Sequence, residues 1–270
     1  MKDSGSGAMK DLSFRLPGSG HKGIVLVHGL TGSPVEMKFL ARRLHAQGLT
    51  VHAPTLAGHG STKQDLVAST YEDWVGTIRL AIRAMAHEVD EVYVAGVCAG
   101  GMAGLRAAIL EGEAVRRVAI YSPALYLDGW NVPRYQQLLM RVIAPAIRIP
   151  GVRNITVVEA PPYGVKWERL RQMLETSGGI EGTLPEFPVI ALYQHHRLNQ
   201  SLRKMLPTAK IPLLLVHSLE DDLAHIRNAR KLRRLYGGEV RMEVLDDSYH
   251  MIHIDKQRNA VARWTAEMCA

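Results

Sequence analysis

Cysteine is scarce in this sequence. The 270 residues include only Cys98 and Cys269, which lie far apart and form no Cys-x-x-Cys pair. Such a count predicts neither a disulfide framework nor a zinc site, and reduced thiols are typical of a cytoplasmic protein. Nucleotide motifs are also missing, because the glycines of 96–101 lack the Lys-Ser/Thr ending of a phosphate loop. We therefore expect no metal and no cofactor.

Long apolar runs are missing as well. No stretch approaches the length of a bilayer-spanning helix, and the first residues do not combine a basic start with an apolar centre. The sequence thus predicts no membrane span and favours the cytoplasm. Residues 1–10 are rich in glycine and serine and lack periodicity, so we expect a flexible leader there.

The positive charge is spread out rather than gathered in one tract. The formal net charge is +7, which gives no nucleic-acid signature on its own. Residues 126–210 carry eleven Lys/Arg against six Asp/Glu, and a second basic cluster comprises Arg227, Arg230, Lys231, Arg233 and Arg234. Such runs are usually solvated helix faces. The alternative interpretation is a surface for an acidic partner such as coenzyme A or an acyl carrier protein.

Short apolar runs alternate with amphipathic stretches along most of the chain. The runs that predict strands are 24–27, 49–53, 91–97, 115–121, 211–217 and 239–245, with helices expected at 71–88, 98–110, 227–236 and 259–267. This alternation predicts an α/β fold with a parallel sheet covered on both faces. Residues 126–210 interrupt it with prolines and aromatics. We therefore predict a core formed by 11–125 and 211–270, with 126–210 inserted as a cap.

A further helix is expected after the first buried strand. Ser33 is a suitable N-cap, Pro34 suits the first helical position, and Glu36 completes the pattern of a capping box. Gly48 would end this helix.

The strongest chemical signal is Gly96-Val97-Cys98-Ala99-Gly100-Gly101, which follows a predicted strand and opens a predicted helix. This is the context of a nucleophile elbow, with cysteine where serine is usual. The turn is so sharp that the residues two before and two after the nucleophile, Gly96 and Gly100, must be small. The helix N-terminus favours the thiolate form of Cys98. We interpret Cys98 as the nucleophile.

Chain order selects the partners of Cys98, because in folds with a nucleophile elbow the nucleophile, the acid and the base follow one another along the chain. His250 lies after the last predicted strand and is our candidate base, with His253 as its competitor. Glu220-Asp221-Asp222 follows the penultimate strand. Asp221 has the usual offset for the acid that orients the imidazole, and Asp222 is the alternative.

An acyl-transfer site also needs an oxyanion hole of two N–H donors. Ala99, at the helix N-terminus, would supply one donor. The loop after the first buried strand would supply the other, most plausibly from Leu30. Three aromatics of the predicted cap, Trp130, Tyr135 and Trp167, are candidates for lining the substrate pocket, although packing of the cap onto the core explains them equally well.

Together these motifs resemble the bacterial carboxylesterase and monoacylglycerol-lipase branch of the α/β-hydrolases. The resemblance rests on the elbow, the acid after the penultimate strand and three further segments, namely 28–32 (HGLTG), 58–60 (GHG) and 248–250 (SYH). It covers roughly residues 21–124 and 211–264. It implies an eight-stranded, mostly parallel sheet, an acyl-enzyme mechanism and an acyl-binding cleft under a cap.

The nucleophile departs from that branch, whose members carry serine at the position of Cys98. An elbow with cysteine in this position resembles those of dienelactone hydrolases and polyhydroxyalkanoate synthases. A serine enzyme changed to cysteine in order to trap an acyl intermediate is an interpretation that the sequence leaves open.

Three functional hypotheses follow. The first is a hydrolase that cleaves a carboxylic ester, a lactone or an acyl thioester. The second is an acyltransferase or condensing enzyme, because an acyl group on cysteine is a thioester, which reacts readily with amines, thiols and carbanions. The third is a ligand-binding protein that has lost catalysis, and the intact set of candidate residues argues against it.

Overall fold

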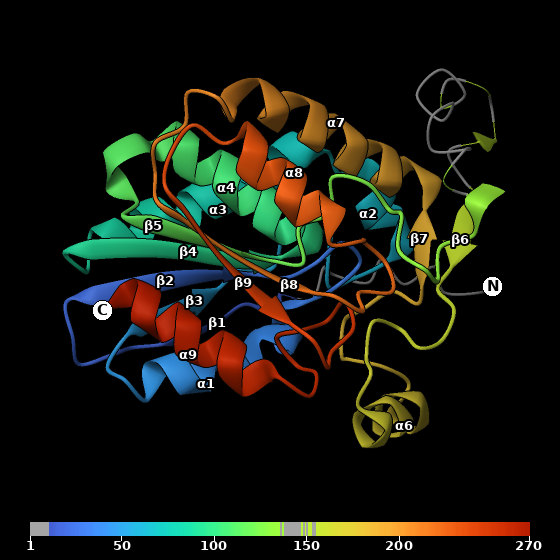
Figure 1. Ribbon diagram of the computed structural model, residues 1–270, viewed down its shortest axis with the longest axis horizontal. Coiled ribbons are helices and arrows are strands. Elements are labelled where there is room, and N and C mark those ends of the chain that lie inside the picture. The colour runs from blue at the N-terminus through green and yellow to red at the C-terminus, as the bar shows by residue number, and fades with distance from the viewer. Residues whose placement is uncertain (1–10, 136, 138–146, 148, 150, 153–154) are drawn as a thin grey trace, which may run out of the picture.

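The fold is seen in a computed structural model, which describes residues 11–135, 137, 147, 149, 151–152 and 155–270. The predicted leader, residues 1–10, lies outside the described residues, as does part of the predicted cap. Figure 1 shows an α/β fold in which one central sheet lies between two layers of helices.

Seven strands form the central sheet within the described ranges. In spatial order they are β1 (Phe14–Leu16), β3 (Thr50–Ala53), β2 (Lys22–Val27), β4 (Glu91–Val97), β5 (Arg117–Tyr121), β8 (Leu213–Ser218) and β9 (Val240–Leu245). All neighbouring pairs are parallel except β1 and β3, which are antiparallel. The fully buried runs in β2 and β4 reflect a sheet covered on both faces. The α/β-hydrolase fold expected from the sequence is thus confirmed.

The expected count of eight strands is wrong for the described part of the chain. Within residues 11–21, only β1 precedes β2, because the sequence Pro17-Gly18-Ser19-Gly20 turns the chain directly into β2. Gly18 is required at this turn, since a Cβ there would overlap the backbone of Gly48 and Leu49.

Helices cover the two faces unequally. The helices and 3-10 turns of the core are η1 (Pro34–Met37), α1 (Lys38–His45), α2 (Lys63–Ala68), α3 (Tyr71–Ala86), α4 (Cys98–Glu111), η2 (Gly112–Ala114), α8 (Arg227–Leu235) and α9 (Arg258–Cys269). The apolar side chains of α1 and α9 pack on one face of the sheet, and those of α3, α4 and α8 pack on the other (Figure 1). This arrangement places the carboxyl ends of β4, β5 and β8 at one edge, where ligands bind in open α/β sheets.

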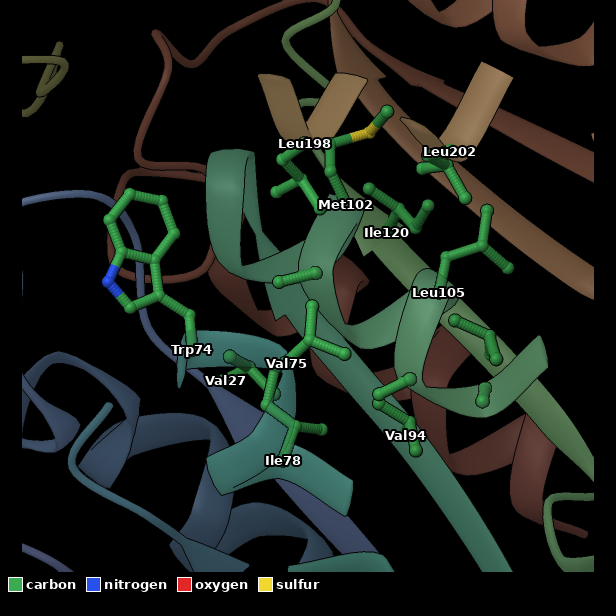
Figure 2. Close-up of a cluster of buried hydrophobic side chains, with 14 of the residues drawn as sticks. Val27, Trp74, Val75, Ile78, Val94, Met102, Leu105, Ile120, Leu198 and Leu202 are labelled. Carbon is green, nitrogen blue, oxygen red and sulfur yellow. The ribbon is translucent and has the colours of Figure 1, made fainter. Parts of the chain in front are cut away.

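The region predicted as a cap contains β6 (Thr156–Val158), α6 (Glu168–Ser177), β7 (Glu186–Pro188) and α7 (Val189–Met205). Strands β6 and β7 form a separate antiparallel pair. Helix α7 packs closely against the core, and Figure 2 shows Leu198 and Leu202 of α7 beside Met102 and Leu105 of α4. The side chains of His195 and Asn199, also on α7, both hydrogen-bond the carbonyl oxygen of Ala124, just after β5. Helix α7 therefore braces the strand next to the elbow.

The predicted capping box after β2 is wrong. The first turn is the 3-10 helix η1, and the Ser33 side chain donates to the carbonyl oxygen of Glu181 instead of capping it. The Glu36 carboxylate accepts a hydrogen bond from the backbone N–H of Gly29. Both side chains are used by tertiary contacts, which outweigh the local preference for a cap.

Candidate active site

Cys98 occupies a sharp turn between β4 and α4. Its φ of +52° lies in the left-handed region that non-glycine residues seldom adopt. The side chain is 8% exposed at the start of α4, where the first N–H groups of the helix have no intrahelical partners. Strained backbone of this kind is frequent at functional sites. The β4–α4 turn places the Cys98 thiol at the edge of the sheet.

The glycines around Cys98 are required by close backbone contacts. A Cβ on Gly100 would overlap the carbonyl oxygen of His28, and one on Gly96 would come within 2.8 Å of Gly100 and Gly101. A Cβ on Gly101 would lie 2.6 Å from the Gly96 oxygen. The elbow therefore needs three small residues, one more than the motif alone indicates.

His250 and Asp221 form a buried pair next to the elbow. The Nδ1 of His250 lies 2.9 Å from both carboxylate oxygens of Asp221. Burial opposes the imidazolium, but the charges of Asp221 and then Cys98 raise the pKa of His250 well above its ordinary value. Burial also opposes ionisation of Asp221, yet the charge of His250 and its hydrogen bond hold the pKa of that carboxyl below its ordinary value. An imidazole held in this way is suited to carry a proton.

The other nitrogen of His250, Nε2, has no hydrogen-bond partner among the described residues. Cys98 is close enough to influence the titration of this ring. The backbone around the imidazole is also held in place, because the Ser122 hydroxyl donates to the carbonyl oxygen of His250 at 2.7 Å. The structure therefore brings together the three residues that the sequence singled out.

Asp222 has different contacts from its neighbour. One carboxylate oxygen accepts the backbone N–H of His250 at 3.2 Å, and the other accepts that of Gly164 at 3.2 Å. The Met251 N–H donates to the carbonyl oxygen of Gly164. Asp222 therefore joins the His250 loop to the segment that contains Gly164, and among the described residues it makes no hydrogen bond to the imidazole nitrogens.

His253, the competing candidate for the base, has a different neighbour from His250. Its Nε2 is 3.8 Å from the Glu36 carboxylate, and its side chain is fully buried. Burial, and then the charge of His250, lower the pKa of His253 to about 3. This neutral ring is not placed between Asp221 and Cys98.

The loop after β2 contains the expected second oxyanion donor. No hydrogen bond of the Leu30 N–H is found among the described residues, and the following Thr31 has a φ of +63°. His28 links this loop to the segment after β3, since its Nδ1–H donates to the Gly29 oxygen and its Nε2 accepts the Leu56 N–H. Burial is the main reason that the pKa of His28 falls to about 3, which keeps the ring neutral and both hydrogen bonds intact.

Residues 181–184 also hydrogen-bond this loop. The Leu184 N–H donates to the Thr31 oxygen at 2.9 Å, and the Ser33 hydroxyl donates to Glu181. The loop that carries Leu30 is thus held both by His28 and by residues 181–184, and no local sequence motif predicted the two contacts to residues 181–184.

The three candidate pocket aromatics are scattered. Trp130 is 60% exposed and Tyr135 is 64% exposed, with Trp130 packed edge-on against Tyr249. The ring of Trp167 lies under the Arg258 guanidinium, 4.4 Å from it. Among the described residues, no hydrogen bond or ring contact joins Trp130 or Trp167 to Cys98 or His250.

Comparison with known proteins identifies the family. The model of the serine aminopeptidase S33 family matches residues 19–257. The chain belongs to this family of α/β-hydrolases. It is 32% identical over 247 residues to a carboxylesterase of Bacillus subtilis (strain 168), covering 90% of this chain and 89% of that protein. It is 24% identical over 220 residues to the thermostable monoacylglycerol lipase of Bacillus sp. (strain H-257), covering 78% and 83% respectively.

The fold has close counterparts among solved structures. One comes from work on two metagenome-derived lipolytic enzymes, LipS and LipT. It superposes with a TM-score of 0.79 at 25% identity, covering 95% of this chain and 96% of that one. The chain is accordingly an enzyme, a hydrolase of the lipase and esterase type. Among the described residues, no helix combines the length and apolar character needed to cross a membrane.

Proposed function

We propose that this enzyme cleaves a carboxylic ester, a lactone or an acyl thioester with Cys98 as its nucleophile. The observation that carries the proposal is the position of Cys98, held at positive φ between β4 and α4 beside the His250–Asp221 pair. Carboxylic esters are the favoured class, since relatives of the chain are named as a carboxylesterase and a monoacylglycerol lipase.

In the first half-reaction the Cys98 sulfur attacks the carbonyl carbon, and the carbonyl oxygen becomes an oxyanion facing the Leu30 and Ala99 N–H groups. The bond to the leaving group then breaks. His250 gives its proton to the departing oxygen or sulfur, which leaves an acyl group on Cys98 as a thioester. Asp221 keeps the imidazole in orientation and stabilises its protonated form.

In the second half-reaction His250 takes a proton from water, and the oxygen of that water attacks the thioester carbon. Collapse of the second oxyanion releases the carboxylic acid and restores the Cys98 thiolate beside the imidazolium. No cofactor takes part in this scheme.

Acyl transfer to an acceptor other than water is the second candidate. Two features favour it, the thioester that a cysteine would form and a basic face on α7 and α8. Arg203 and Lys231 both donate to the Tyr126 hydroxyl, while Arg230 and Arg233 are exposed nearby on α8. Such a face suits coenzyme A or an acyl carrier protein, both of which are acidic. A ligand-binding protein without catalysis is the third candidate.

Intact mass spectrometry after incubation with activated esters and acyl thioesters, with and without an amine, separates these candidates. Rapid release of free acid, with wild-type turnover lost in Cys98→Ala, is the result expected for a hydrolase. An adduct that lasts in water and clears on adding amine would favour a transferase. Cys269→Ser is the matched control, because this other thiol is buried in α9. Absence of any adduct or product would leave only ligand binding.

Cys98→Ser tests the choice of nucleophile itself. We expect serine to form an oxyester in place of the thioester, and less acyl-enzyme to accumulate in water. A faster hydrolysis by Cys98→Ser would instead favour a serine ancestry for this site.

A further inference from the structure

A buried carboxylate lies directly behind residues 28–32, the loop after β2 that carries Leu30 and is called the oxyanion loop below. Glu36 is 4% exposed, and its Oε1 accepts the N–H of Gly29 at 2.8 Å. The carboxylate also packs against Gly32, where an added Cβ would overlap Oε2. One side chain therefore contacts the loop on both sides of Leu30, the expected oxyanion donor.

The backbone of Ser33 is the second group that hydrogen-bonds this carboxylate, after Gly29. His253 faces Glu36 from the segment after β9, but neither of its ring nitrogens has a hydrogen-bond partner among the described residues. Burial raises the pKa of Glu36 to about 7, and the hydrogen bond from Gly29 is the leading opposing influence. Burial of an ionised carboxylate is costly unless hydrogen bonds such as the one from Gly29 compensate for the lost hydration.

Because Gly29 directly precedes Leu30, holding its amide also affects the orientation of the Leu30 N–H. Glycine has no side chain to restrict its backbone, so the peptide that joins Gly29 to Leu30 would otherwise rotate easily. The N–H of that peptide is the expected oxyanion donor. Fixing the Gly29 N–H at Glu36, together with the Gly29 oxygen at His28, holds both ends of the residue that precedes the donor.

We propose that Glu36 is a positioning residue, which aims the Leu30 N–H into the oxyanion hole by holding the Gly29 amide. This inference rests on the proposed function of Cys98. It assigns Glu36 no contact with the substrate, and its effect is confined to steps that form an oxyanion.

Two reactions of Cys98 separate this role from general damage. Acylation by an activated ester passes through an oxyanion, whereas alkylation by iodoacetamide displaces iodide at a saturated carbon and forms none. Glu36→Ala is expected to slow acylation by about 100-fold, as for loss of one oxyanion donor, and to leave alkylation unchanged. Glu36→Gln, which keeps an acceptor for Gly29, is expected to restore most of the acylation rate.

His253→Gln is the matched control, because it changes the other buried polar group beside Glu36 without removing the contact to Gly29. It is expected to leave the ratio of acylation to alkylation rates unchanged. If Glu36→Ala does not fold, the acylation and alkylation rates are compared in Glu36→Asp instead, whose side chain is one methylene shorter.

Three results would overturn the proposal. They are an unchanged acylation rate in Glu36→Ala, an equal loss of acylation and alkylation, and an equal loss in the Ala and Gln variants. A wild-type enzyme that alkylates at Cys98 but is never acylated would overturn the proposed function, and this inference with it. If the proposed function holds but the positioning role of Glu36 does not, wild type and Glu36→Ala are acylated at the same rate.

Discussion

Asp221 and Asp222 are adjacent carboxylates that hold different groups. Asp221 meets the imidazole of His250, and Asp222 meets the backbone of His250 and Gly164. The sequence favoured Asp221 by its offset from the strand and left Asp222 as the alternative, and in the structure the two side chains point to different groups. Strand offset predicts which residue is near the imidazole, but it contains no information on the loop contacts that turn Asp222 away.

This difference predicts unequal effects of removing each charge. Asp221→Asn is expected to lower kcat by about 10⁴-fold, because an amide favours the wrong imidazole tautomer. Asp222→Asn keeps an acceptor for the His250 N–H and is expected to lose far less activity. Steady-state kinetics on an activated ester measures both variants, and equal losses would contradict these assignments.

Glu36 predicts a pH-dependent stability. Burial raises its pKa from 4.5 to about 7 in the folded protein. Between these pH values the unfolded chain ionises while the folded chain keeps its proton, so the wild type loses stability as pH rises. Relative to Glu36→Gln, its free energy of unfolding is expected to fall by roughly 3 kcal/mol over this range and then to level off.

Urea unfolding of both proteins at several pH values measures this difference. Every other titrating group is shared by the two proteins, so the comparison isolates Glu36. A difference that stays constant from pH 4.5 to 7 would show that the carboxyl is not desolvated.

At the scale of elements, the sequence predicted best where local preference and tertiary packing agree. The strand–elbow–helix unit of β4 and α4 is one such case, because its apolar run and its small residues serve the same turn. The capping box at Ser33 and Glu36 failed because distant groups, Glu181 and Gly29, bind those side chains. Helix α2 was missed although Thr62 and Asp65 form a true capping box there.

The elbow predicts a steep cost for any side chain at Gly100. Gly100→Ala would place a Cβ on the carbonyl oxygen of His28, so the β4–α4 turn must move away from the oxyanion loop. We expect loss of activity and destabilisation of several kcal/mol, as for strain at a special backbone position.

Gly76→Ala is the control for this substitution. Gly76 lies within α3, and nothing comes within 4 Å of an added Cβ. Alanine is expected to stabilise that helix by about 0.5–1 kcal/mol with full activity. Thermal unfolding and ester turnover of both variants check the pair, and similar behaviour of the two would refute the strain argument.

At the scale of the whole molecule, composition and alternation predicted the fold class, but not which helices of the predicted cap pack on the sheet. Helix α7 lies within the predicted cap, yet it packs on α3 and α4. Its apolar positions resemble those of any surface helix, so its sequence does not identify the layer that it joins. The contacts of Leu198 and Leu202 decide this point (Figure 2).

If α7 is part of the core, its packing should support global stability. Leu198 is fully buried, and Leu198→Ala is expected to lower the free energy of unfolding by about 2–5 kcal/mol. Leu80→Ala serves as the control, since Leu80 is 68% exposed and its loss should change little. Circular dichroism during chemical unfolding measures both, and a small effect at Leu198 would assign α7 to a separately unfolding cap.

Aromatic rings link the oxyanion loop to the interior on the α3 side. His28, which holds Gly29, packs edge-on against His59 with centroids 5.0 Å apart, and His59 packs in the same way on Trp74 at 5.5 Å. Burial lowers the pKa of His59 to about 4, so this ring is uncharged at neutral pH. Once Trp130, Trp167 and Trp264 are replaced by phenylalanine, the indole emission of Trp74 therefore provides an intrinsic optical probe, sensitive to any rearrangement that reaches His28 and needing no label near Cys98.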